Sequence, residues 1–174
     1  MKKIPENTNR EKGQSLMEFS ISLVVLLILI AGIVDLGRAF FTYIALRDAA
    51  QEGASYAAVS NPDPLTSGDV TTYCNAITQR TLMTTRELDG GGSSGPIDLA
   101  TLADQNEITV QTQINGTDCT SMSAADICLG SAVSVSVTYD SFPMTMPFMG
   151  TIVGSQTISL NAAVVDSILT PACQ

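Results

Sequence analysis

The chain has 174 residues and a net charge of −9, from 8 basic and 17 acidic residues. After Lys12 it contains four arginines and no lysine, so it lacks the clustered cations with which proteins bind nucleic-acid phosphates. It also contains no histidine, the commonest general base and metal ligand, and we expect neither an enzyme nor a cofactor or metal site.

A short polar head opens the chain. Residues 1–13 carry a net charge of +2, whereas residues 14–174 carry −11. Residues 1–12 show no apolar periodicity, so we expect them to be unstructured.

An apolar run follows, 19 residues from Leu16 to Val34 in which Glu18 is the only charge. As a helix this run is about 28 Å long, close to the hydrocarbon thickness of a bilayer, which is about 30 Å. A cleavable secretory signal is the competing interpretation, but its apolar region spans only about 7–15 residues. We therefore expect a single-pass membrane anchor. The basic head places the N-terminus in the cytoplasm and the body outside it.

The helical pattern continues beyond the apolar run, and Asn61-Pro62 ends it. The sequence therefore predicts one helix over about 14–60, a membrane span extended by an amphipathic stem. Asp35 and Arg38, three residues apart, can form an ion pair on its surface. A mostly apolar stripe runs along the stem, which we interpret as cover for the body's core, with a partner surface as the alternative; its residues are Leu36, Phe40, Tyr43, Arg47, Ala50, Ala54 and Ala57.

The body, residues 61–174, contains signals for one helix and three strands. Residues 69–88 have helical spacing. Apolar and polar residues alternate in 107–114, 132–139 and 157–165, as in antiparallel strands with one buried face. We predict an α+β fold in which the long helix and the short helix pack on a three-stranded antiparallel sheet.

The connection between the last two strands is apolar and contains two prolines and three methionines, "FPMTMPFMG" over 142–150. We expect an irregular segment that packs across the sheet edge. The alternative is a soft docking surface for another subunit, because methionine side chains adapt to many partners.

Four cysteines lie in the body at wide spacing, without the close pairs typical of zinc sites. They indicate two disulfides formed in an oxidising compartment, with four free thiols as the alternative. Three connectivities are possible, and we favour Cys119–Cys128 with Cys74–Cys173.

The stretch "KGQSLMEF", from Lys12 to Phe19, resembles the processing site of type IVb pilins of the tight-adherence (Tad) class, in which Gly-x-x-x-x-Glu precedes an aromatic residue. Residues 13–58 are similar to the signature region of the TadE-like family, minor pseudopilins or assembly proteins of that system. The similarity includes the basic head, the apolar span, "DLGR" and an alanine-rich helix.

The resemblance implies a pilin-like fold and a cut between Gly13 and Gln14 by a membrane prepilin peptidase. Glu18 would then pair with the new amino group at Gln14, and Phe19 stands where major pilins of this class usually have Tyr. The alternative is that Glu18 extends to the lipid headgroups and Gly13 is a linker residue.

We therefore expect three parts: a cytoplasmic leader (1–13), a membrane and stem helix (14–60) and an extracytoplasmic disulfide-linked head (61–174). The expected function is assembly of a Tad-type pilus or secretion system from the inner membrane. The expected partners are the bilayer, a prepilin peptidase, other pilins or pseudopilins and the Tad membrane platform, but no nucleic acid. The alternative is an uncleaved anchor that presents an extracytoplasmic binding domain.

Overall fold

The described part of the computed structural model comprises residues 9–60, 70–87, 97–123, 126–146, 149–152 and 154–169. These residues divide into two compact units. The first joins the residues up to Gly37 with those of Met144–Gln156, and the second joins those of Arg38–Pro143 with those of Thr157–Gln174.

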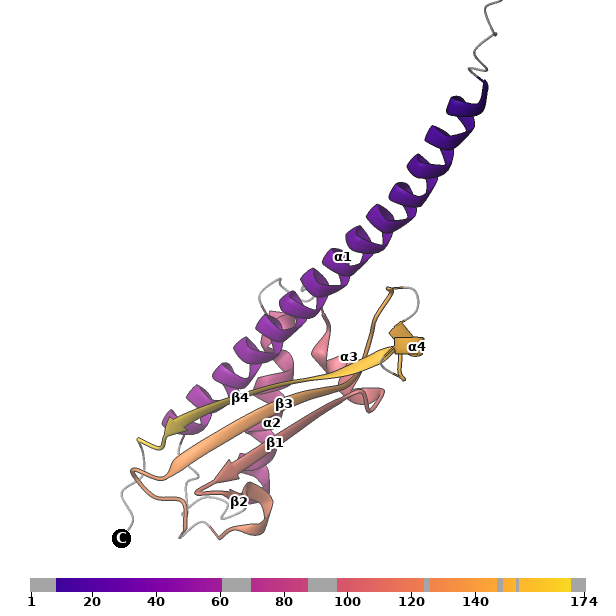
Figure 1. Cartoon of the computed structure of the whole chain (residues 1–174). Coiled ribbons are helices and arrows are strands. Elements are labelled where there is room, and N and C mark those ends of the chain that lie inside the picture. The colour runs from indigo at the N-terminus through magenta and orange to yellow at the C-terminus, as the bar shows by residue number, and fades with distance from the viewer. Residues whose placement is uncertain are drawn as a thin grey trace, which may run out of the picture. The chain divides into compact units, whose positions relative to one another are not determined.

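One long helix, α1 (Asn9–Val59), contributes to both units (Figure 1). It confirms the helix predicted over about 14–60, but it begins earlier, so the expectation that residues 1–12 are unstructured is wrong for 9–12. Arg10, Glu11 and Lys12 are strong helix formers, and an interior glycine such as Gly13 costs a helix only about 1 kcal/mol relative to alanine. Residues 1–8 lie outside the described part of the chain.

In the first unit, the connection between the last two strands returns to α1. It contains a short helix, α4 (Met149–Ile152), and its ends are joined where the Met144 N–H donates to the carbonyl of Gln156 at 2.8 Å. The segment contacts Gly32 and Asp35 of α1, which corrects the expectation that it packs across the sheet edge. Nothing in its apolar composition could reveal a contact made across more than 100 residues of chain.

The second unit contains an antiparallel sheet with the strand order β2-β1-β3-β4 (Figure 1). Its strands are β1 (Ile108–Ile114), β2 (Thr117–Asp118), β3 (Ala132–Pro143) and β4 (Thr157–Ser167). Three of them confirm the predicted strands, two being longer than expected, and β2 makes a fourth. The α+β class is therefore correct and the strand number was wrong.

The added strand is formed by a tight hairpin turn at Asn115-Gly116, both of which have positive φ, 50° and 80°. Two such residues make the turn that suits the twist of a hairpin, and Asn-Gly is its strongest sequence signal. The Asn115 side chain secures the turn, because its Oδ1 accepts from the Ala132 N–H at 3.0 Å and its Nδ2 donates to Ser131 Oγ at 3.1 Å. A two-residue strand has no alternation to detect, and only this dipeptide could have predicted it.

The core of the second unit lies on one face of the sheet. The predicted inward residues of β3, Val133, Val135 and Val137, are fully buried, and Tyr139 is 7% exposed. On β4 the predicted face is the more buried one, with Ala162 at 2% exposed against 66% for Val165 on the opposite face.

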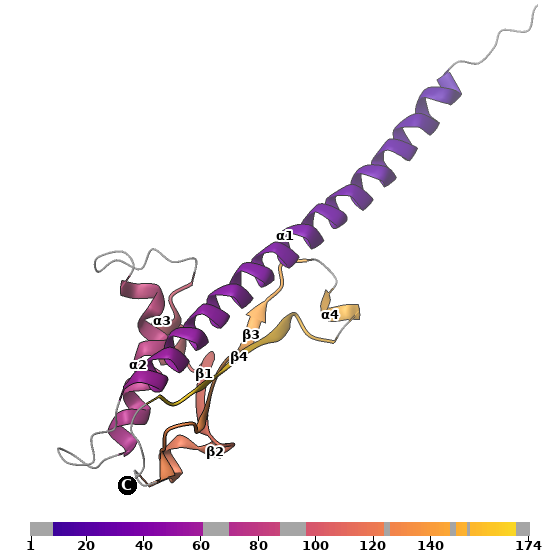
Figure 2. The same cartoon turned by 90° about the vertical axis from the view of Figure 1, so that its left-hand side faces the viewer.

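Two helices join α1 on this face of the sheet: α2 (Val70–Glu87), close to the predicted bounds, and the unpredicted α3 (Leu99–Asp104) (Figure 2). The side chain of Asp98 caps α3 by accepting from the Thr101 N–H at 3.2 Å. Position 69, where the predicted helix begins, lies outside the described residues.

The C-terminal half of α1 covers the sheet as predicted, and a glycine allows its close approach. A Cβ built on Gly53 would lie 2.1 Å from Thr81 Oγ1 of α2 and 3.3 Å from Val135 Cγ1 of β3. Around it α1 buries small side chains completely, namely Ala49, Ala50 and Ala54. At the end of α1, the carbonyl of Ala58 accepts from the Leu169 N–H at 2.8 Å.

The buried stripe of α1 differs from the predicted one in its first half. Leu36, Phe40 and Tyr43 are 71%, 59% and 41% exposed, whereas Thr42 and Leu46 are buried at 4% and 0%. Large apolar side chains led the prediction to the wrong side of the helix. Thr42 can be buried because its hydroxyl donates to the carbonyl of Arg38 at 2.9 Å, within the helix.

Candidate membrane anchor and processing site

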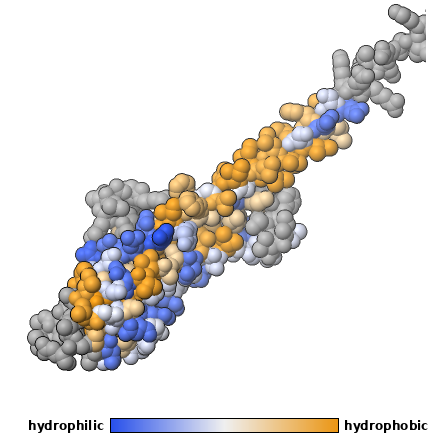
Figure 3. All heavy atoms as spheres, turned by 60° about the vertical axis from the view of Figure 1, so that its left-hand side comes forward, coloured by the Kyte–Doolittle hydropathy of each residue, from blue (hydrophilic) through white to orange (hydrophobic). Residues whose placement is uncertain are grey.

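The N-terminal half of α1 exposes nearly all of its apolar surface (Figure 3). The exposed large apolar side chains between Leu16 and Val34 range from 43% to 70% exposed. Among the described residues, this is the one helix long and apolar enough to cross a membrane. The core helix of a soluble protein would pass the same test of length and composition, but its apolar side chains would be buried.

The polar groups of this half of α1 are compatible with hydrocarbon. A helix satisfies its backbone N–H and C=O groups internally, as a bilayer requires. Ser20 does the same with its hydroxyl, which donates to the carbonyl of Leu16 at 2.8 Å. Glu18 remains the only charge between Leu16 and Val34, and its side chain is exposed.

The predicted processing residues lie near the start of α1. Gly13 and Gln14 are helical and exposed, as are Glu18 and Phe19, the latter 64% exposed. Gln14 and Glu18 are four residues apart, which puts them on the same face of the helix. A Cβ added to Gly13 would meet nothing within 4 Å, so packing within this chain gives no reason for a glycine there.

Asp35, one residue beyond the apolar run, is fully buried. Its Oδ1 accepts from the Thr145 hydroxyl and its Oδ2 from the Met146 N–H. Each hydrogen bond to a charged group contributes about 1.5–3 kcal/mol, so the connection offsets much of the cost of burying this carboxylate. Sequence reasoning missed these contacts because the partners are 110 and 111 residues apart.

The Asp35–Arg38 ion pair stays a prediction. Within the second unit, Arg38 makes a cation–π contact with the Phe142 ring. The guanidinium carbon lies 5.5 Å from the ring centroid.

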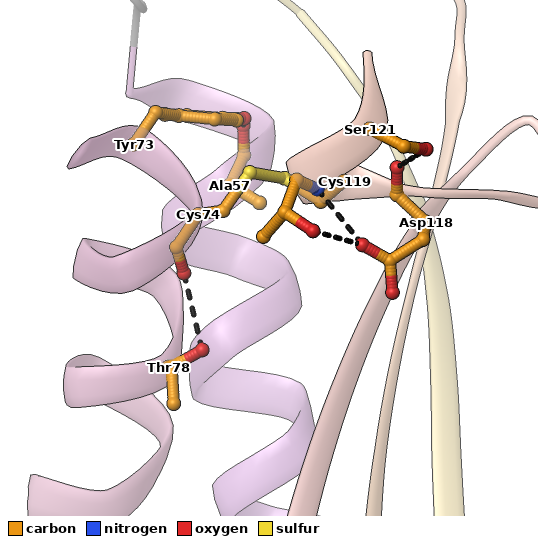
Figure 4. Close-up of a disulfide and its surroundings, with 8 residues drawn as sticks. Ala57, Tyr73, Cys74, Thr78, Asp118, Cys119 and Ser121 are labelled. Carbon is orange, nitrogen blue, oxygen red and sulfur yellow. Dashed lines mark hydrogen bonds between the residues drawn. A yellow bond between two sulfur atoms is a disulfide. The ribbon is translucent and has the colours of Figure 1, made fainter. Parts of the chain in front are cut away.

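A disulfide joins Cys74 of α2 to Cys119, which begins the 3₁₀ helix η1 (Cys119–Ser121) (Figure 4). This pairing contradicts the favoured connectivity of Cys119–Cys128 with Cys74–Cys173. That preference assumed local pairing, whereas packing brings α2 next to η1, with 6.0 Å between the two Cα atoms. Cys128 is also in a disulfide, and Cys173 lies outside the described residues.

Hydrogen bonds hold both sides of this disulfide (Figure 4). The Tyr73 hydroxyl donates to the carbonyl of Ala57 at 2.7 Å, which ties α2 to the end of α1. Burial, with a smaller contribution from nearby Tyr56, raises the pKa of Tyr73 to about 12. Asp118 caps η1 by accepting from the Thr120 hydroxyl and N–H, and these bonds lower the pKa of its carboxyl.

The comparison with known families concerns the anchor. Residues 13–55 match the sequence model of the TadE family, described as TadE-like protein. Residues 13–55 of this chain are TadE-like. No curated protein and no solved structure matches it.

The TadE-like region begins at Gly13 and ends within α1, four residues before the helix does. It therefore contains the exposed apolar span, Glu18, Asp35 and the first part of the buried stem, but none of the sheet. A TadE-like region on an exposed apolar helix indicates a membrane protein associated with a Tad pilus.

The second unit has a hollow of about 690 Å³, lined in part by residues of the TadE-like region. Its lining includes Arg38, Phe41, Asp98, Tyr139 and Phe142. The Tyr139 hydroxyl donates to Glu107 Oε2 at 3.2 Å, and burial and the Glu107 carboxylate raise its pKa. Among the described residues, no group of three or more His, Cys, Asp or Glu could hold a metal ion.

Proposed function

We propose that this chain is a minor pseudopilin-like subunit that takes part in assembly of a Tad-type (type IVb) pilus or secretion system. It would be anchored in the inner membrane by Leu16–Val34, with the leader (1–13) in the cytoplasm and the body outside. A prepilin peptidase would cut between Gly13 and Gln14. The proposal gives the chain no catalytic role, in keeping with its lack of histidine.

The observation that carries the proposal is the glycine at position 13. A helical glycine costs about 1 kcal/mol relative to alanine, and here no neighbouring atom requires it. Its use is therefore to be sought outside the folded chain. A peptidase cleft that must receive extended backbone supplies one, because a glycine both weakens the helix and lacks a Cβ.

Glu18 is the second part of the proposal. After the cut, the α-amino group of Gln14 lies one helical turn from Glu18, or near the Glu18 of a neighbouring subunit. Such a pair would neutralise the carboxylate next to hydrocarbon, where an unpaired charge costs about 2.5 kcal/mol or more.

The test is mass spectrometry of the mature N-terminus in cells with and without the peptidase. We expect Gln14 as the first residue in peptidase-positive cells. Gly13→Leu should abolish the cut, whereas the matched control Gly37→Leu, at another helical glycine with open space around it, should leave it unchanged. An uncut Gly13–Gln14 bond in peptidase-positive cells would refute processing.

A separate variant tests charge pairing. Glu18→Gln should be cut normally but should enter assemblies several-fold less, whereas Glu52→Gln, at an exposed glutamate of the same helix, should assemble normally. Normal assembly of the Glu18 variant would remove the pairing hypothesis and leave the cut itself standing.

The second candidate function is an uncleaved anchor that presents a binding domain. The hollow beside Arg38 and Phe142 favours it, since it combines a cation with aromatic walls. This candidate would be favoured over the first if the leader (1–13) stayed intact and the protein bound a ligand saturably. Phe41→Ala should then weaken that binding.

A further inference from the structure

The connection between β3 and β4 lies within the longest charge-free stretch of the chain. No Asp, Glu, Lys or Arg lies between Asp140 and Asp166, in a chain with 25 such residues. The part from Met144 to Gln156, which we call the apolar connection, contains three methionines. A segment without charged side chains can lie beside lipid without the cost of taking a charge out of water.

The apolar connection is fixed to α1 at a defined level. The Met146 Sδ lies 3.7 Å from the position that a Cβ would take on Gly32, which is inside the apolar run. Thr145 and Met146 also hold both carboxylate oxygens of Asp35, one residue beyond the run. These contacts place Thr145 and Met146 beside the last turn of the membrane-spanning stretch.

We propose that the apolar connection lies in the headgroup and outer acyl region of the bilayer, as a second membrane contact besides α1. Three observations converge on lipid as its occupant: the absence of charge, the methionine-rich composition and the continuity with the apolar surface of α1. Asp35 acts as the tether, and its own charge is kept from lipid by the two hydrogen bonds it accepts.

This inference rests on the proposed membrane anchor, and it gives the long β3–β4 connection a role. A segment that served only to join two antiparallel strands could be a turn of a few residues. The longer connection instead reaches α1 and lies against it within the first unit. The anchor would thereby acquire a fixed depth, because sliding α1 along its axis would pull the apolar connection out of its own layer.

The test uses tryptophan, which the chain lacks. Three single-tryptophan variants of the full-length protein are reconstituted in vesicles of phosphatidylethanolamine and phosphatidylglycerol, with and without brominated acyl chains. L23W reports the span, M146W the apolar connection, and L129W an exposed position of the second unit, where Leu129 is 56% exposed.

Bromine quenches tryptophan only at close range. We expect strong quenching of L23W and M146W and several-fold weaker quenching of L129W, which aqueous iodide should quench instead. If M146W responds to iodide and not to bromine while L23W responds to bromine, the anchor stands and the second contact is refuted. Protection of M146W from both quenchers would also refute it, because protein and not lipid would then cover this position. If L23W is not quenched by bromine, the proposed anchor itself fails.

The tether is tested in the M146W protein. Adding Asp35→Ala to the M146W protein should lower its bromine quenching at least twofold. Adding the same change to the L23W protein should leave its quenching unchanged. Adding Asp48→Ala, at an exposed aspartate of the same helix, should change neither. Undiminished quenching of M146W in the Asp35→Ala background would overturn the role of Asp35.

Discussion

The two halves of α1 share one regular helix but use their side chains in opposite ways. Between Leu16 and Val34 the helix carries large apolar residues that remain exposed, whereas beyond Arg38 it buries small ones such as Ala49 and Ala54 against the chain's own sheet and helices. Apolar content therefore does not indicate which half is buried by the protein itself. The first half needs an apolar environment from outside the chain, and the second half is itself part of the core.

The largest expected effect compares a leucine from each half. Leu46→Ala should lower the free energy of unfolding of the body by about 2–5 kcal/mol, because Leu46 is fully buried and its truncation leaves a cavity. Leu27→Ala should leave it unchanged, because Leu27 is 57% exposed. Urea unfolding of the full-length protein in a mild detergent, followed by circular dichroism of the tyrosines, measures both. Equal losses would show that the two halves do not differ as described.

A pH titration tests how the C-terminal half of α1 is held against α2. The raised pKa of Tyr73 means that the folded state favours the protonated phenol. Its contribution to stability is complete below pH 10 and is lost as the pH rises from 10 to about 12, a change of about 2–3 kcal/mol. Tyr73→Phe should be less stable than the wild type by about 1 kcal/mol at pH 8, because it lacks the bond to Ala57, and this deficit should reverse as the pH approaches 12. A deficit that is constant with pH would contradict the burial of this hydroxyl.

The smallest expected effect concerns two glycines of α1. Gly53→Ala should destabilise the body by about 1–2 kcal/mol, because the overlap of its Cβ with Thr81 outweighs the gain in helix propensity. Gly37→Ala, with open space around it, should cost nothing and can gain up to about 1 kcal/mol. The same urea unfolding gives both values. Adding Thr81→Ala should restore most of the loss in the Gly53 variant, and failure to do so would place the strain elsewhere.

Local sequence patterns predicted most of the secondary structure. Alternating residues in β1, β3 and β4 predicted strands because one face of each is buried, and helical spacing predicted α2 close to its bounds. The short elements were missed: β2 is two residues long, and α3, with six, is too short to show a period. The pilin-like assignment and the boundaries between leader, stem and head stay predictions.

The candidate site also has features that the sequence could predict and features that it could not. Gly13, Glu18 and the apolar run could be recognised because they lie within a few residues of each other and of a known pattern. The Cys74–Cys119 pairing and the contacts of Asp35 could not, because they join residues 45 and about 110 positions apart.

The sequence by itself determined the long helix, its apolar half, the TadE-like region and the three long strands, since each depends on residues that are neighbours along the chain. Only the tertiary structure decided which face of α1 is buried, which cysteine Cys74 binds and what holds Asp35. These depend on which distant segments meet. Small residues such as Gly53 allow distant segments to pack closely. The sequence does not reveal this, because a helical glycine reads the same whether its surroundings are packed or open.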